Sequence, residues 1–106
     1  MKRLYKSVRS RATDIPKKVK EKVYERDKGC CILCGRSGNP WCHFISRQKG
    51  GLGIEQNIVT LCNDCHRKYD ESSGVVYQTM RFAIKEYLLE HYPNLSEKDL
   101  SYKKTE

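Results

Sequence analysis

Four cysteines of this sequence occur as two pairs, and two residues separate the members of each pair: Cys31 and Cys34, Cys62 and Cys65. Thiolates at this spacing can bind one tetrahedral zinc ion, and a site closed by four protein ligands is structural rather than catalytic. Cys30 lies beside the first pair and could compete for the ion, but Gly35 after Cys34 favours the 31/34 pair. The sequence therefore predicts a structural zinc site, and any catalysis must come from other residues.

Three further side chains near these pairs could do chemistry: His43, Asn57 and His66. A neutral imidazole can accept a proton near pH 7, and it can also bind a divalent ion. His66 directly follows the last cysteine, so the zinc site would fix its position. We predict the order strand, glycine-rich loop, strand, helix, with zinc holding the start of that helix to the turn before the first strand.

A helix is expected over residues 15–27, before the first cysteine pair. Ile15, Val19 and Val23 form one apolar stripe at helical spacing. Asp14 is a candidate N-cap, and Gly29 is a candidate residue for ending the helix.

The rest of the chain predicts short elements that end at glycine or proline. Their expected ranges are a strand at 41–46, a loop at 48–53, a strand at 58–61, a helix from the third cysteine to about 71, and a helix at 76–91 ended by Pro93. Residues 96–100 show only weak helical signals.

The chain has 106 residues, of which 38% are hydrophobic, so we expect one small domain with a modest core that a metal would help to hold together. The expected division is a flexible basic arm at 1–13, a single domain at 14–92 and a polar C-terminal tail at 93–106. No apolar run is long enough for a membrane span, and the N-terminus lacks the apolar segment of a signal peptide. The expected location is the cytoplasm, where paired cysteines bind metals more often than they form disulfides.

The formal net charge of +8 is concentrated in the first two thirds of the chain. Residues 1–28 hold eleven Lys and Arg against four Asp and Glu, residues 29–68 have a net charge of +3, and residues 69–106 a net charge of −2. A basic face attracts phosphate backbones without reading sequence. The candidate phosphate contacts are Arg47, Lys49, Arg67 and Lys68. The alternative for these four residues is a solvated basic surface.

The combination of motifs resembles the HNH endonuclease family, the ββα-metal nucleases. The resemblance covers about residues 22–69 and rests on four stretches: Cys31-Ile32-Leu33-Cys34-Gly35, Trp41-Cys42-His43-Phe44-Ile45-Ser46-Arg47, Gly50-Gly51, and the run from Asn57 to His66. The short chain and basic arm are most similar to small HNH proteins encoded by phages and prophages. The fold that this resemblance implies is α+β: a zinc-stapled ββα-metal core at about 40–71 with flanking N- and C-terminal helices.

The resemblance also implies roles for the three candidate residues. His43 matches the general base that takes a proton from the attacking water. Asn57 matches the family asparagine, which fixes the loop and the orientation of the base or helps to hold the metal. His66 matches a ligand of the catalytic divalent ion, which would be Mg²⁺, Mn²⁺, Ni²⁺ or Zn²⁺.

Cys42 departs from the family pattern, in which Asp or His commonly precedes the base and helps to bind the catalytic metal. A thiolate is a softer ligand and suits Zn²⁺ better than Mg²⁺. Two interpretations stay open: Cys42 binds the catalytic ion, or it packs inward and water takes its place.

The function implied is a metal-dependent DNA endonuclease of weak sequence specificity that nicks duplexes or cuts both strands, leaving 5′-phosphate and 3′-hydroxyl ends. The alternative is a zinc-stabilised nucleic-acid-binding protein without catalysis, which would have no need of the His43, Asn57 and His66 set. Family analogy adds one partner besides DNA, a phage terminase during DNA packaging. The cytoplasm would then be that of a bacterial host.

Overall fold

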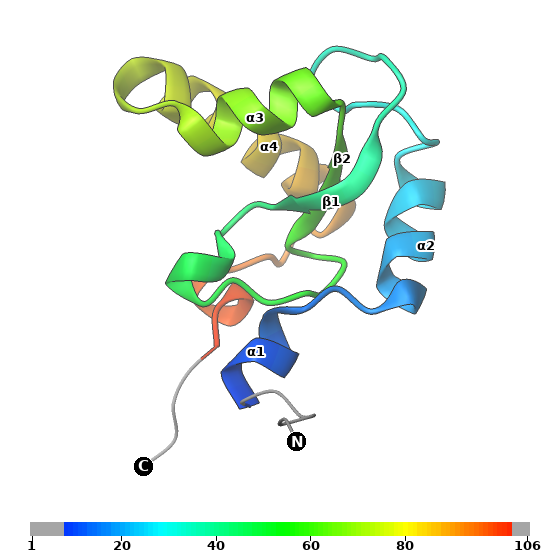
Figure 1. The fold of residues 1–106 in the computed structure, drawn as a ribbon, viewed down its shortest axis with the longest axis vertical. Helices are drawn as coiled ribbons and strands as arrows, with labels where there is room; N and C mark the ends of the chain where they lie inside the picture. Colours follow the sequence, from blue (N-terminus) through cyan, green and yellow to red (C-terminus); the bar gives the residue numbers. More distant parts are fainter. Residues whose placement is uncertain (1–7, 103–106) are drawn as a thin grey trace, which may run out of the picture.

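The computed structural model describes residues 8–102. A two-stranded antiparallel sheet lies at its centre, with helices before and after it (Figure 1). The elements in chain order are α1 (Val8–Thr13), α2 (Lys17–Arg26), β1 (Asn39–His43), the 3-10 helix η1 (Arg47–Lys49), β2 (Ile58–Leu61), α3 (Asn63–Glu71), α4 (Gly74–His91) and the 3-10 helix η2 (Glu97–Leu100). The mixed helices, the small sheet and the four-cysteine cluster confirm the expected α+β class.

Helix α2 forms where the apolar stripe predicted a helix, but its start differs. Pro16 occupies the N-cap position without a side-chain cap, so the prediction of Asp14 as the cap is wrong. The Asp14 carboxylate accepts a hydrogen bond from the Arg47 guanidinium instead. At the other end Gly29 adopts a positive φ of 68° and its N–H donates to the Tyr24 carbonyl, which stops the helix as expected.

The two strands pair with Cys42 opposite Val59 and His43 opposite Ile58. Strand β2 matches its expected range, and all four of its residues are buried. Strand β1 was expected at 41–46, but it begins at Asn39 and ends at His43. The side chains of β1 alternate, so Pro40 and Cys42 point into the core while Trp41 faces outward.

Helix α3 follows directly from the end of β2, and α4 packs against α3 (Figure 1). The Tyr69 hydroxyl on α3 donates to the carbonyl of Phe44, just after β1, at 2.8 Å. Buried residues of both strands, both helices and η2 form one core cluster, which includes Phe44, Leu61, Ile84, Leu88 and Leu100. The ββα unit is therefore held against α4 and the end of the chain.

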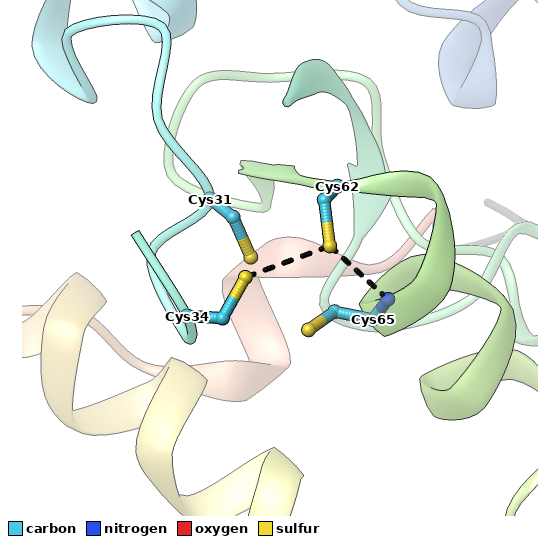
Figure 2. A group of neighbouring side chains, drawn as sticks. All are labelled: Cys31, Cys34, Cys62 and Cys65. Carbon is cyan, nitrogen blue, oxygen red and sulfur yellow. Dashed lines mark hydrogen bonds between the residues drawn. The ribbon is translucent and has the colours of Figure 1, made fainter. Parts of the chain in front are cut away.

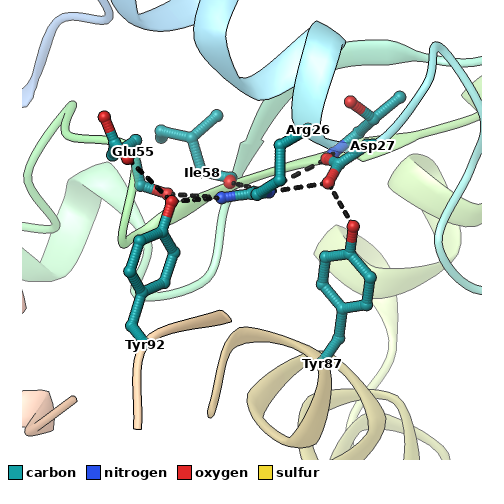
Figure 3. A network of polar contacts seen from close by, with 7 residues as sticks. Arg26, Asp27, Glu55, Ile58, Tyr87 and Tyr92 are labelled. Atoms are coloured by element: carbon teal, nitrogen blue, oxygen red, sulfur yellow. Dashed lines mark hydrogen bonds and ion pairs between the residues drawn. The ribbon is translucent and has the colours of Figure 1, made fainter. Parts of the chain in front are cut away.

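A polar network joins α2 to β2 and to the end of α4 (Figure 3). The Arg26 guanidinium forms an ion pair with Asp27 and donates to the carbonyl of Ile58 at 2.8 Å. Asp27 also accepts from the backbone N–H of Thr60 at 2.9 Å and from the Tyr87 hydroxyl. Because burial of an unpaired charge is costly, these contacts fix α2 beside the sheet.

Both ends of the described chain are more ordered than the sequence suggested. The basic arm expected at 1–13 includes helix α1, whereas residues 1–7 of that arm lie outside the described residues. In the expected C-terminal tail, Leu100 is buried and its carbonyl accepts from the N–H of Leu52 at 2.8 Å. No helix within residues 8–102 is both long enough and apolar enough to cross a bilayer.

The glycine-rich loop between the strands packs closely against its neighbours. A Cβ at Gly51 would lie 1.6 Å from the carbonyl oxygen of Ile45, and one at Gly53 would lie 1.8 Å from that of Asp14. The N–H of Gly53 donates to the carbonyl of Ala12 at 3.0 Å. Gly51 therefore lets the loop lie against the segment after β1, and Gly53 lets it lie against the segment after α1.

Candidate active site

The four paired cysteines come together at one end of the sheet (Figure 2). Cys31 and Cys34 lie in the turn after α2, Cys62 is the N-cap of α3, and Cys65 lies in the first turn of α3. Their sulfur atoms all lie within 4.8 Å of one another, and Cys34 Sγ is 3.6 Å from Cys62 Sγ. Four sulfurs each about 2.3 Å from a tetrahedral zinc ion would be about 3.8 Å apart. The donor set and its spacing therefore fit a closed structural zinc site.

Arg36 lies beside this cluster. Its Nε is 3.5 Å from Cys34 Sγ and its Nη2 is 3.9 Å from Cys62 Sγ. The guanidinium hydrogen bond lowers the pKa of Cys34 to about 6, which favours the thiolate form that binds metal. Cys30 lies outside the cluster, is exposed, and contacts the carbonyl of Lys28.

A cleft of about 710 Å³ opens on the outward side of β1. Two of the three candidate catalytic residues, His43 and His66, line it together. The other lining residues come from the α1–α2 connection, α2, β1, the loop after β1 and α3: Asp14, Ile15, Lys20, Trp41, Ser46, Arg47, Gln48 and Asp70.

His43 is half-buried, and its Nε2 lies 2.8 Å from the carbonyl oxygen of Thr13 at the end of α1. A carbonyl only accepts hydrogen bonds, so in the neutral ring Nε2 must carry the proton and Nδ1 the lone pair. Burial lowers the pKa of His43 from its ordinary value, and the positive charge of Arg47 lowers it further. His43 is therefore set up as a neutral imidazole with Nδ1 free to accept a proton.

His66 and Asp70 lie one turn apart on the same face of α3, and His66 Nε2 is 3.4 Å from Asp70 Oδ2. Asp70 was not among the residues picked from the sequence. The sequence does contain a pattern that indicates Asp70, because an acidic residue four positions after a histidine lies on the same face of a helix. An imidazole nitrogen and a carboxylate oxygen at this separation can bind one divalent ion, because two ligand atoms about 2.1 Å from one ion lie about 3.0 to 3.4 Å apart.

Asn57 is fully buried and does not line the cleft. Its Oδ1 accepts from the N–H of Ile45 at 2.9 Å, and its Nδ2 donates to the carbonyls of Ile45 and Leu52 at 3.1 and 2.9 Å. The resemblance implied two roles for Asn57, and these hydrogen bonds match the role of fixing the loop. Both polar atoms of the side chain are engaged in them, so neither is directed at a metal ion.

Cys42 lies in the core on the side of β1 opposite to the cleft. Its side chain is fully buried, and burial raises its pKa well above the ordinary value. Of the two interpretations left open for Cys42, this burial matches inward packing, since Cys42 is buried while its neighbour His43 lines the cleft.

The four residues predicted to contact phosphates lie at different positions relative to the cleft. Arg47 lines the cleft, where its Nη2 is 2.5 Å from Asp14 Oδ1. Lys49 is exposed on η1 near the cleft, whereas Arg67 and Lys68 are exposed on α3 outside the lining. Lys20 of α2 does line the cleft and was not predicted, because only the fold brings α2 beside β1.

Comparison with known proteins gives one matching family model and a partly similar restriction enzyme. Residues 31–72 match the model of the HNH endonuclease family, which confirms the resemblance stated from the motifs. The chain is also 33% identical over 66 residues to the type IV methyl-directed restriction enzyme EcoKMcrA of Escherichia coli (strain K12). That match covers 53% of this chain, which spans about a quarter (24%) of the length of this relative.

Proposed function

We propose that this chain, through its HNH-type segment, is a metal-dependent endonuclease that hydrolyses phosphodiester bonds in DNA. The observation that carries the proposal is the meeting of His43, His66 and Asp70 in one open cleft. The HNH match over residues 31–72 and the likeness to a restriction enzyme support nuclease chemistry in general.

In this proposal Nδ1 of His43 takes a proton from the water that attacks the phosphorus. The carbonyl of Thr13 holds the ring and fixes its tautomer through Nε2. Such proton transfer by a positioned side chain typically accelerates a reaction by about 10²- to 10⁴-fold. The half-buried position keeps His43 neutral, as this role requires.

His66 and Asp70 would hold the catalytic divalent ion. When bound, such an ion polarises a phosphate oxygen and stabilises the leaving 3′ oxygen. The pair supplies one nitrogen and one oxygen ligand, which suits Mn²⁺, Ni²⁺ or Zn²⁺ as well as Mg²⁺. With Cys42 in the core, water would fill the remaining positions.

DNA would reach the cleft along its basic residues. Arg47 and Lys20 line the cleft, so we assign them contacts to the phosphates beside the scissile bond. Lys49, Arg67 and Lys68 are exposed near it and would contact phosphates farther along the strand. Contacts to phosphates carry no sequence information directly, so we expect weak sequence specificity.

One observation favours the alternative of a non-catalytic, zinc-stabilised nucleic-acid-binding protein. Because Cys42 is buried, the position before His43 supplies no ligand for a catalytic ion, and the pair His66 and Asp70 both come from α3. The cleft and the cysteine cluster would serve both functions equally well.

A supercoiled-plasmid assay separates the two functions. The wild type, His43→Ala and His91→Ala are compared at matched zinc content with Mg²⁺, Mn²⁺, Ni²⁺ or Zn²⁺ added. His91 is exposed and lies outside the cleft lining, so it is the matched histidine control. We expect nicked or linear DNA with the wild type and His91→Ala, and a loss of about 10²-fold or more with His43→Ala. If all three proteins bind the plasmid and none cuts it with any metal, the non-catalytic alternative holds.

The same assay reports the mode of cleavage, since nicked circles and linear DNA separate on a gel. Association with a phage terminase stays a prediction from family analogy. Co-purification of this chain with a purified terminase large subunit would test it.

A further inference from the structure

Trp41 is the single tryptophan of the chain, and its position has no role in the chemistry proposed above. It lies on β1 two residues before His43, and its side chain is 49% exposed. About half of the indole surface is therefore open to solvent and available to a ligand. The burial pattern of β1 leaves Trp41 and His43 on its outward side while Cys42 is buried, and the pairing of β1 with β2 is irregular between Asn39 and Cys42.

Trp41 also lines the same cleft as His43. Ile15 and Trp41 are the two apolar side chains of that lining, and they come from segments that meet only in the fold. The cations Lys20 and Arg47 line the cleft with them, together with the acids Asp14 and Asp70, and Arg47 is ion-paired with Asp14. An aromatic platform among cations is the combination with which proteins bind the backbone and stacked bases of single strands.

We propose that Trp41 is a stacking platform for an unpaired base next to the scissile phosphate, and that the preferred substrate is DNA with an unpaired nucleotide at that point. This inference rests on the proposed nuclease function for its position relative to the scissile bond. In a regular duplex both faces of each base are covered by neighbouring bases, so an indole can stack only on a base that is unpaired or turned out of the helix. Bulges, mismatches and junctions between single and double strands offer such a base.

Stacking of one base on an aromatic side chain corresponds to about a 5- to 150-fold change in affinity on substitution by alanine. We therefore expect Trp41→Ala to lose a factor in this range on DNA that has an unpaired base. The affinity for a fully paired duplex depends on phosphate contacts and is expected to change little.

The test uses the His43→Ala protein with its zinc, so that binding is measured without cleavage. Tryptophan fluorescence is titrated with three 20-nucleotide probes: a perfect duplex, the same duplex with a one-base bulge, and one of its strands alone. Because Trp41 is the sole tryptophan, its quenching reports contact at this position alone. We expect strong quenching and tighter binding with the bulged and single-stranded probes, and weak quenching with the perfect duplex.

Three variants in the His43→Ala background complete the test, with labelled probes and anisotropy as the readout. Trp41→Ala should lose the preference for unpaired probes, and Trp41→Phe should keep most of it. Phe82→Ala removes another exposed aromatic, 65% exposed on α4 and outside the cleft lining, and should change nothing. Equal affinities of Trp41→Ala and its parent for all three probes would overturn the inference.

Failure of this inference is distinct from failure of the proposed function. Cleavage of plasmid by the wild type without a Trp41-dependent preference overturns the inference alone. A Trp41-dependent preference in a protein that cuts no DNA overturns the nuclease proposal and supports a binding protein for unpaired DNA.

Discussion

Cys65 and His66 are consecutive residues in the first turns of α3, yet they belong to two sites of opposite character. Cys65 joins a cluster of four thiols in which every ligand position is taken by the protein. His66 faces a cleft in which one imidazole and one carboxylate leave most positions around an ion open. The N-terminal end of α3 thus contributes to two sites. One is a closed cysteine cluster that stabilises the fold, and the other is an open cleft that can bind substrate.

The two sites also differ in how many parts of the chain build them. The cysteine cluster is built from two short segments of the chain, and each segment supplies two of the four cysteines. The cleft draws residues from the α1–α2 connection, α2, β1, the following loop and α3. Damage to the closed site should therefore unfold the protein, whereas damage to the open site should cost activity and leave the fold intact.

The largest effect is expected from Cys65→Ser, or from removal of zinc by a strong chelator. Structural zinc can contribute about 10 to 16 kcal/mol in small domains, which matches or exceeds the whole stability of a typical domain. We expect loss of bound zinc and of the cooperative unfolding transition, measured by metal analysis and circular dichroism. Cys30→Ser is the matched control, because Cys30 is exposed and outside the cluster. A folded, zinc-free Cys65→Ser protein would show that the cluster is not what holds this end of the sheet.

The next effect should appear at the open site without loss of structure. Asp70→Ala removes one of the two ligand side chains, and we expect plasmid cleavage to fall by at least about 100-fold, because a bound ion supplies several kcal/mol of transition-state stabilisation. Thermal unfolding should stay close to that of the wild type, since the Asp70 side chain is exposed.

Asp64→Ala is the control for Asp70. It removes an exposed acid of the first turn of α3 that lies outside the cleft lining. Equal cleavage by the Asp70→Ala and wild-type proteins would remove Asp70 from the site and leave His66 as the single candidate ligand on α3.

The difference between the two sites explains how much could be predicted from the sequence. Two pairs of cysteines at fixed short spacing specify their own geometry, so the cluster and the strand Ile58–Leu61 that leads into it were predicted correctly. The direction of Cys42 depends on which face of β1 meets the core, and its two interpretations could not be separated before the fold was known. The contacts of His43 with Thr13 and of the cleft with Lys20 join residues far apart in the chain, and no local pattern reports them.

Asp70 and helix α1 were missed for different reasons. Asp70 shares a helix face with His66, so its spacing was informative and was overlooked. Helix α1 has only six residues, too few for a stable helix by itself. Tertiary contacts hold it, since Arg9 donates to the carbonyls of Arg47 and Gln48 and His43 contacts Thr13. Such tertiary contacts can hold a short segment in a helix that it would not form by itself.

A smaller effect is expected from Asn57→Ala, which tests whether this residue belongs to the scaffold or to the open site. The change breaks the three hydrogen bonds by which the buried Asn57 side chain ties Ile45 to Leu52. We expect the free energy of unfolding in urea to fall by about 2 to 4 kcal/mol, because backbone groups are left unpaired. Asn94→Ala, at an exposed position, should be neutral. Unchanged stability together with weakened binding of the catalytic ion would instead place Asn57 among the metal ligands.

The smallest effect concerns the pH dependence of cleavage. His43 must be neutral to accept a proton, and its ordinary pKa of 6.5 is lowered mainly by burial. A lowered pKa keeps the ring neutral to lower pH, so the acidic limb of the rate profile should lie below pH 6.5 and the rate should be level near neutrality. Arg47 in the cleft contributes to the lowering through its charge.

Arg47→Gln therefore tests whether a charge inside the cleft affects the pKa of His43 more than a charge on the surface outside it. Loss of the nearby positive charge raises the pKa of His43, so the acidic limb should move to higher pH by less than about one pH unit. Arg67→Gln removes an exposed charge on α3 outside the cleft lining and should leave the limb in place. Because a change in DNA affinity alone scales the rate equally at every pH, a shift of the limb distinguishes an electrostatic effect on His43 from weaker binding of phosphate. An identical shift in both variants would mean that the limb reports overall charge rather than the environment of His43 in the cleft.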